Sequence, residues 1–408
     1  MNLLLNKIKE ILITYYDNNN ILYMVYDELE KINKTKGKLN LSFKGLDENI
    51  DFDINEVKEL SNRLDQKIKK FKLDGDLVIL RQNNPILDEL LIDFDILNFF
   101  IYFYNLKNIE IKDLNKLIEI IYYIKKTYKK QNYPLTFVEQ KEKLENLAYL
   151  DFGVIDNYEE FKDELEELKK NNQIKYVTSH IHAEELLKRE MGKKVEKNFL
   201  KKFYNNLEIL TDSLMVLPHG NKFKRNIVKE NIRAVKKRCN YDNLIMTDIL
   251  TFIYIKEFYK QFQNKLECIY DKINIRINSC NSLDDIINIE KNVFEKILTS
   301  IPLLKEENIA ILKQQIQKNH IDYFLLDNTI YELTNFFNFI KYKSDTKNQK
   351  IMSSNSDRSH ICMAANLKYL ITTDSRLEKR ATVIYNFLNI NTKVILLKKI
   401  KLIKKIPR

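Results

Sequence analysis

Four short apolar segments, grouped in two distant blocks, most constrain the fold of this chain. NLAYLDF (146–152) and IKYVTS (174–179) form the first block, and KYLITT (368–373) and TKVILL (392–397) form the second. Both segments of the first block are followed by helical periodicity, which is typical of βαβ units and a parallel sheet. The residues between the blocks, about 195–345, read as long amphipathic helices. The sequence therefore predicts an α/β domain whose parallel sheet is split by a large helical insertion.

The composition indicates more than one domain. The chain has 408 residues, of which 44% are apolar, so it can bury a substantial core. Only six glycines and five prolines interrupt it, and long helices should therefore dominate. We place a mostly helical or α+β module at 1–140 and the α/β domain at 141–408.

The N-terminal module is predicted from hydrophobic periodicity and turn residues. A helix–helix–hairpin order fits a winged-helix-like nucleic-acid reader, but the same order occurs in many interaction modules, which we favour. The module is then a regulatory or binding unit for a protein partner. Its expected elements are helices at 2–17, 20–34, 54–72, 86–106 and 111–131, a hairpin at 39–54 and a strand in DLVILR (76–81).

Four acidic residues are placed where they can meet. Asp151 and Asp374 each follow a predicted strand, and the carboxyl ends of parallel strands lie at one edge of a sheet. Asp357 is expected at the start of the helix DRSHICMAAN. Glu185 lies about two turns after Ser179, which caps the helix that follows IKYVT. All four carboxylates are therefore expected at the same rim.

Carboxylates gathered in this way repel one another. At an effective dielectric constant of about 20, two charges 4 Å apart cost about 4 kcal/mol. Either raised pKa values or bound divalent cations must offset this cost. His180 and His182 should point to different faces of their helix, and the four cysteines lack zinc-site spacing. Oxygen-only ligands favour Mg²⁺ or Mn²⁺ over zinc.

The segments YLDFGVI, VTSHIHAEEL, SDRSHICMAA and LITTDSRLEKRA together resemble the PIN-like nuclease domain. The last two segments carry the more specific matches, and residues 1–140 and the insertion lie outside the resemblance. The resemblance implies a Mg²⁺- or Mn²⁺-dependent endonuclease that leaves a 5′-phosphate, with RNA favoured over DNA. It also implies that the catalytic metal ligands are Asp151, Glu185, Asp357 and Asp374.

Neighbouring residues are expected to support these ligands. Glu184 is the reserve for Glu185, because the choice between them depends on helix register. His360 matches the family pattern and is interpreted as a residue that supports the metal ligands or the fold rather than as a general base. Thr373 and Ser375 flank the final aspartate and are expected to hydrogen-bond it or a phosphate, with local turn bonding as the alternative.

Gly153 departs from the family pattern. The family has Asn or Ser at this position, two residues after the first aspartate, where the side chain orients the carboxylate. The absence of this side chain in Gly153 predicts reduced activity or a metal that is held differently. The alternative functions are a catalytically inactive PIN-like nucleic-acid-binding protein and a helical interaction scaffold. In a bacterium the resemblance suggests a toxin or an antiviral defence effector, roles that no residue pattern tests.

The charge of the chain points to an anionic partner. The net charge of +11 is typical of proteins that bind nucleic acid or an acidic membrane surface. The segment KFKRNIVKENIRAVKKR (222–238) has eight basic residues against one acid. As a helix it would present a phosphate-binding strip, with a solvated surface helix as the alternative. The basic residues are Lys222, Lys224, Arg225, Lys229, Arg233, Lys236, Lys237 and Arg238.

The apolar segments do not predict a membrane protein. The N-terminal stretch is amphipathic and lacks a small-residue cleavage site, and the most apolar windows are too short to cross a bilayer. Cys239, Cys268, Cys280 and Cys362 show no disulfide or zinc spacing and are expected to be buried thiols. We therefore expect a cytoplasmic protein.

Overall fold

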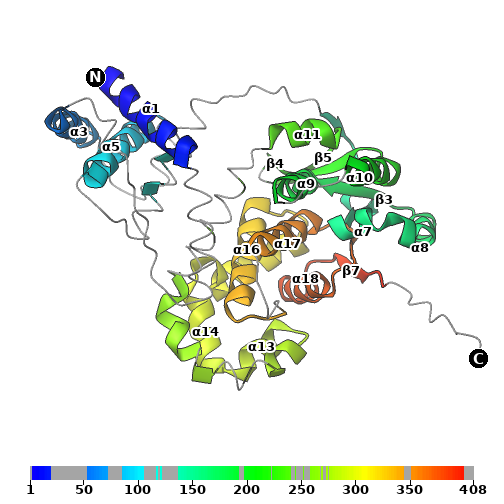
Figure 1. Cartoon of the computed structure of the whole chain (residues 1–408). Coiled ribbons are helices and arrows are strands. Elements are labelled where there is room, and N and C mark those ends of the chain that lie inside the picture. Colours follow the sequence, from blue (N-terminus) through cyan, green and yellow to red (C-terminus); the bar gives the residue numbers. More distant parts are fainter. Residues whose placement is uncertain are drawn as a thin grey trace, which may run out of the picture. The chain divides into compact units, whose positions relative to one another are not determined.

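A computed structural model gives the structure of the chain (Figure 1). Two compact units divide it: Met1–Asn132 with Asp242–Ile253, and Tyr133–Tyr241 with Tyr254–Arg408. The structure describes residues 2–19, 53–71, 85–104, 116–117, 120–121, 137–192, 197–221, 223–239, 244, 251, 258–266, 268–269, 273, 275–343 and 351–398.

The described part of the first unit is helical. It contains α1 (Asn2–Asn19), α3 (Ile54–Ile68) and α5 (Pro85–Tyr104), so three of the expected helices are confirmed. Their apolar faces are buried, and Ser61 Oγ of α3 donates to Asn98 Oδ1 of α5 at 2.8 Å. The expected helix at 20–34, the strand at 76–81, nearly all of the hairpin at 39–54 and most of the helix at 111–131 lie outside the described residues.

A seven-stranded mixed sheet forms the centre of the second unit. The strand order is β1-β5-β4-β3-β2-β6-β7. The pairs that join β4, β3, β2, β6 and β7 are parallel, whereas β5 is antiparallel to both β4 and β1. The four predicted strands are confirmed as β2 (Leu147–Leu150), β3 (Lys175–Ser179), β6 (Tyr369–Thr372) and β7 (Lys393–Leu396). The other three are β1 (Val138–Gln140), β4 (Leu214–Asn221) and β5 (Lys224–Lys229).

Two of these strands correct the expected helical insertion at 195–345. β4 and β5 form an antiparallel hairpin inside that range, so the sheet is mixed and includes strands from the expected insertion. Met215 and Val216 of β4 point to opposite faces and are both buried, as are Ile227 and Val228 of β5. The basic residues of β5 also fit one face of a helix, which is why the sequence did not predict this hairpin.

Helices cover both faces of the sheet and make a three-layer α/β unit. Ala148 and Leu150 of β2 face one helical layer, and Leu147 and Tyr149 face the other. The first layer contains α7 (Phe152–Asp156), α8 (Tyr158–Asn172), α10 (Lys197–Thr211) and α11 (Ile232–Arg238). The second contains α13 (Leu283–Ile289), α14 (Lys291–Ser300), α15 (Glu306–Gln317), α16 (Tyr323–Phe339), α17 (Ile351–Ala364) and α18 (Ser375–Leu388).

The remaining elements connect these layers. Helix α9 (His180–Gly192) follows β3 directly and contributes to both cores. Two 3₁₀ turns, Leu144–Asn146 and Pro302–Leu304, precede β2 and α15. Among the helices that the structure describes, none is both long enough and apolar enough to cross a membrane.

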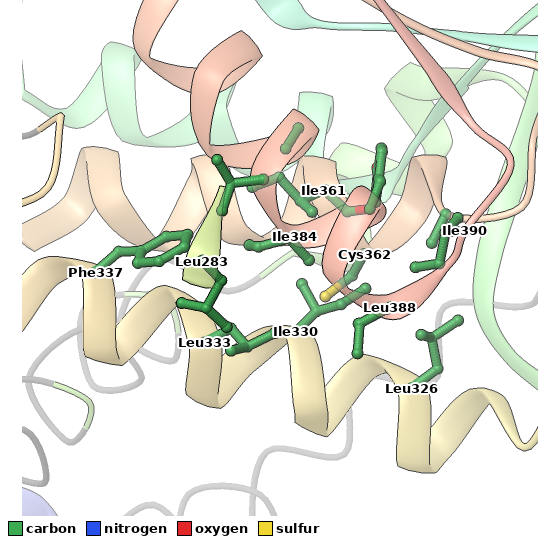
Figure 2. Close-up of a cluster of buried hydrophobic side chains, with 14 of the residues drawn as sticks. Leu283, Leu326, Ile330, Leu333, Phe337, Ile361, Cys362, Ile384, Leu388 and Ile390 are labelled. Atoms are coloured by element: carbon green, nitrogen blue, oxygen red, sulfur yellow. The ribbon is translucent and has the colours of Figure 1, made fainter. Parts of the chain in front are cut away.

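The helical segment before α17 is part of the core of the second unit. Figure 2 shows Ile330 and Leu333 of α16 packed with Ile361 of α17 and Ile384 of α18, and with Leu283 of α13. These side chains are buried and form one continuous cluster with the β2 face described above. The segment therefore builds one of the two layers that cover the sheet, and it is not an appendage.

Candidate active site

Asp151 lies at the carboxyl end of β2, and both of its carboxylate oxygens are fixed. Its backbone N–H donates to Ile371 O at 2.9 Å, which continues the ladder between β2 and β6. Its Oδ1 accepts from Phe152 N at 2.7 Å, because Asp151 caps α7. Its Oδ2 accepts from Thr372 Oγ1 at 2.8 Å. The carboxylate is therefore held in one orientation by β6 and by the first turn of α7.

Glu185 on α9 faces the same point as Asp151. Nε2 of His360 lies 3.2 Å from Glu185 Oε2 and 3.5 Å from Asp151 Oδ1. The reserve residue Glu184 turns elsewhere, and its Oε1 lies 3.8 Å from His180 Nε2. Ser179 accepts from Ile181 N at 3.3 Å, in the manner expected of a helix cap. The structure thus places Glu185 with the first aspartate.

His360 carries a positive charge between these two carboxylates. Burial alone would lower its pKa, but the charge and hydrogen bond of Glu185, together with the charge of Asp151, raise the pKa of His360 to about 9. The ring is therefore protonated at neutral pH, and both of its N–H groups donate. Nδ1 donates to Tyr149 OH at 2.8 Å, and this hydroxyl lies 2.7 Å from Ser179 Oγ.

Asp374 closes β6 and caps α18. Its Oδ1 accepts from Arg376 N at 2.7 Å, and Arg376 Nη2 lies 3.2 Å from its Oδ2. Thr372 Oγ1 accepts from Asp374 N at 2.9 Å while it donates to Asp151. This buried threonine, which the sequence analysis did not select, links the first and last aspartates. The spacing T-x-D was the signal that could have identified it.

Asp357 corrects an expectation about local structure. It lies inside α17, which begins at Ile351, and not at the start of a helix. Its carboxyl nevertheless belongs to the same group of charges. Burial raises its pKa to about 7, a shift that the charge of Arg380 opposes and the charges of Asp374 and Asp151 increase. Asp357 is therefore close enough to Asp151 and Asp374 for their charges to alter its protonation.

The repulsion among these carboxyls is offset in two ways. Burial raises the pKa of Asp151 as it does that of Asp357, which favours their neutral forms. Burial would also raise the pKa of Glu185, but the charge and hydrogen bond of His360 outweigh burial and lower it. Hydrogen bonds and charge from an arginine of α18 lower the pKa of Asp374 despite its burial. Neighbouring titratable groups whose pKa values are shifted in opposite directions are typical of functional sites.

The oxygen ligands that the site offers are of the type that binds a hard divalent cation. Asp151 and Glu185 present oxygens to one point, and carboxylate oxygens are the ligands that Mg²⁺ and Mn²⁺ prefer. At this point the positive charge is supplied by His360. Within the described ranges, no group of three or more His, Cys, Asp or Glu side chains has the arrangement of a metal site. Asp151 and Glu185 are the residues that could hold a cation here.

Gly153 makes room for a hydroxyl beside the site. A Cβ atom at this position would lie 2.4 Å from Thr373 Oγ1 and 3.5 Å from Asp151 Oδ2. The hydroxyl of Thr373 therefore occupies the space that a side chain at position 153 would need. Orientation of the Asp151 carboxylate, which the glycine was expected to weaken, comes instead from Thr372 and from the N–H of Phe152.

Substituting Gly153 with alanine should therefore destabilise the second unit. We expect the free energy of unfolding to fall by about 1–3 kcal/mol, the usual cost of overpacking, in a urea titration. In the Thr373→Ala background the clash is absent, and the same change should be neutral or slightly stabilising because alanine favours a helix over glycine. An equal loss in both backgrounds would contradict this packing.

His182 has a structural role. It is fully buried, its Nε2 lies 2.9 Å from Leu150 O, and burial together with the charge of His360 lowers its pKa to about 3. The neutral ring donates to the carbonyl group at the end of β2. Ser375 is the exposed first residue of α18.

Arg225 is not available for nucleic acid. Its side chain is buried, and Nη1 donates to Asp327 Oδ2 at 2.9 Å while Nη2 donates to Cys362 O at 2.7 Å. Its guanidinium group also lies 4.7 Å from the centre of the Tyr323 ring. Arg225 therefore joins β5 to α16 and α17, and its assignment as a phosphate-binding residue is wrong.

The rest of the basic segment does not form one strip. The expected helix is divided into β5 and α11, because residues 224–229 pair in the sheet. Three of its cations form ion pairs, and the partners are Asp212 for Lys229, Glu190 for Lys236 and the buried Glu230 for Arg238. Lys224, Arg233 and Lys237 are exposed, and Lys222 lies outside the described residues.

Comparison with protein-family models, with curated proteins and with solved structures finds no match to this chain. The likeness to PIN-like nucleases thus rests on the sequence segments quoted above, and the function that follows from it is a proposal.

Proposed function

We propose that the chain is a Mg²⁺- or Mn²⁺-dependent endonuclease that hydrolyses phosphodiester bonds. The observation that carries this proposal is the meeting of Asp151 and Glu185 at Nε2 of His360, 3.5 and 3.2 Å away. The charge of Asp357 also helps to raise the pKa of His360. Carboxylates with shifted pKa values that meet beside a cationic group are typical of functional sites.

The chain's own residues would prepare this edge of the sheet for a phosphodiester. Asp151 and Glu185 would hold the cation, and Thr372 and Phe152 N–H keep the carboxylate of Asp151 in place. Asp374 is fixed by the first turn of α18. When bound, the cation would activate water and neutralise negative charge on the phosphate. The positive charge of His360 would then no longer be required between the two carboxylates.

RNA is the proposed substrate in preference to DNA, on the resemblance alone. The cytoplasm remains the proposed location, since Cys239, Cys268, Cys280 and Cys362 are all free thiols, as in reducing compartments. The alternative function is an inactive nucleic-acid-binding protein. It is favoured by the nitrogen of His360, which already supplies a positive charge to Asp151 and Glu185.

Incubation with labelled single-stranded RNA and DNA, with Mn²⁺ or with chelator, tests the proposal. We expect wild-type protein to cleave with Mn²⁺ only, to leave 5′-phosphates, and to lose cleavage in the Asp151→Asn variant. Binding without cleavage, unchanged by Asp151→Asn, would support the inactive binding protein. If neither polymer binds at low salt, an interaction scaffold formed by the helices replaces both.

A further inference from the structure

A basic hollow lies between α10 and α11, and none of the four candidate acids lines it. Its volume is about 420 Å³. Apolar and aromatic atoms of Leu200 and Tyr204 form part of its wall, and four cationic side chains from the two helices complete it. The lining residues are Leu200, Lys201, Tyr204, Arg233, Lys236 and Lys237.

Most of the positive charge in this hollow has no acidic partner among the described residues. Lys236 forms an ion pair with Glu190. Lys201, Arg233 and Lys237 are exposed and make no ion pair with any acid in the part of the chain that the structure describes. Three cations that line one hollow repel one another, and an anion placed between them would remove that repulsion. The hollow is therefore suited to a ligand with more than one negative charge.

The geometry of Arg233 favours phosphate as that anion. Its guanidinium carbon lies 4.7 Å from the centre of the Tyr204 ring, so the guanidinium group is held against an aromatic surface. A guanidinium group placed in this way keeps its N–H edge available for paired hydrogen bonds to phosphate oxygens. The half-buried ring of Tyr204 adds a surface on which a base or sugar can pack.

The hollow is connected to the candidate active site through α9. Helix α11 packs against α9, and Lys236 reaches Glu190 on the same helix that carries Glu185. The wall of the hollow therefore contacts the helix that supplies one of the proposed catalytic carboxylates. Its volume of about 420 Å³ falls within the range of pockets that bind small ligands, which is roughly 300–1,000 Å³.

We propose that the α10–α11 hollow binds the backbone of single-stranded nucleic acid at phosphates away from the bond that is cleaved. This inference rests on the proposed function for its substrate class. It assigns Lys201 and Tyr204, which lie outside the basic segment 222–238, to the same site as Arg233 and Lys237. Their role is to position the strand, and they do not take part in the chemical step.

The test compares two triple variants of the full chain. Lys201→Ala/Arg233→Ala/Lys237→Ala removes the unpaired cations of the hollow. Lys162→Ala/Lys169→Ala/Lys170→Ala removes three exposed lysines of α8, so both variants reduce the net charge from +11 to +8 (11 − 3 = 8). The probe is a fluorescein-labelled oligouridine of about 20 nucleotides, longer than a typical single-strand site. Binding is measured in chelator at several salt concentrations, so no cleavage is required.

We expect the hollow variant to bind the probe about tenfold or more weakly. We also expect the slope of log affinity against log salt concentration to become shallower by about two. The α8 variant should change neither quantity appreciably. Charge-retaining Lys201→Arg/Lys237→Arg should bind as the wild type does, which separates charge from folding. Melting temperatures of all variants are recorded in parallel.

Equal affinity of the two alanine variants would overturn the inference, and so would a wild-type protein that does not bind the probe. The result is separable from the proposed function. Cleavage by the wild type with unchanged binding by the hollow variant would leave the nuclease and reject this site. Specific loss of binding in a protein that does not cleave would support the site and reject the nuclease.

Discussion

Replacing Glu185 with glutamine is expected to reduce the rate of RNA cleavage by about 100-fold or more, whereas the same change at Glu184 should leave the rate within about twofold of the wild type. The two residues are neighbours on α9. Only Glu185 reaches Nε2 of His360, which also contacts Asp151, while Glu184 lies beside His180. The loss should therefore follow position on the helix and not charge.

The measurement is the initial rate of cleavage of labelled single-stranded RNA at saturating Mn²⁺, with melting temperatures of both variants as a control for folding. Each variant removes one negative charge and keeps the size of the side chain, so the pair is closely matched. Equal rates in the two variants would show that the carboxylate facing Asp151 has no special role in cleavage.

Substituting Arg225 with alanine is expected to lower the free energy of unfolding by about 3–5 kcal/mol. The buried guanidinium group pairs with Asp327 and donates to a main-chain carbonyl of α17, so truncation leaves a carboxylate and a carbonyl without their donors. Lys224→Ala, one residue earlier and exposed, should change the same quantity by less than about 0.5 kcal/mol.

A urea titration followed by circular dichroism measures both values. Replacing both partners, as in Arg225→Met with Asp327→Leu, should recover much of the loss because no buried charge is then left alone. Similar stability of the Arg225→Ala and Lys224→Ala variants would contradict the buried ion pair. It would also reopen the assignment of Arg225 to a nucleic-acid surface.

The strands that carry the site could be predicted because their signals are local. LAYL and YLIT are short apolar runs, and an aspartate that caps the next helix follows each of them within two residues. Each pattern is therefore complete within a short stretch of sequence. The β4–β5 hairpin could not be predicted in the same way. Its lysines and arginine resemble one face of a basic helix until the pairing partners, which are distant in sequence, are known.

The site itself was partly predictable, for a related reason. Asp151 and Asp374 follow from their places after strands, and helix register distinguishes Glu185 from Glu184. The positive charge of His360 could not be inferred from sequence, because it depends on acids that the fold brings from two other elements, Glu185 of α9 and Asp151 at the end of β2. Thr372 was missed in favour of Thr373, since the direction of each side chain at the end of β6 depends on strand pairing.

The most direct measurement is the change in melting temperature of the full chain when Mn²⁺ is added. A cation held by Asp151 and Glu185 stabilises only the folded state, so the wild type should melt at a higher temperature with Mn²⁺, while Asp151→Asn should show no rise. An unchanged melting temperature in the wild type, or an equal rise in both proteins, would contradict a divalent-cation site at this edge of the sheet.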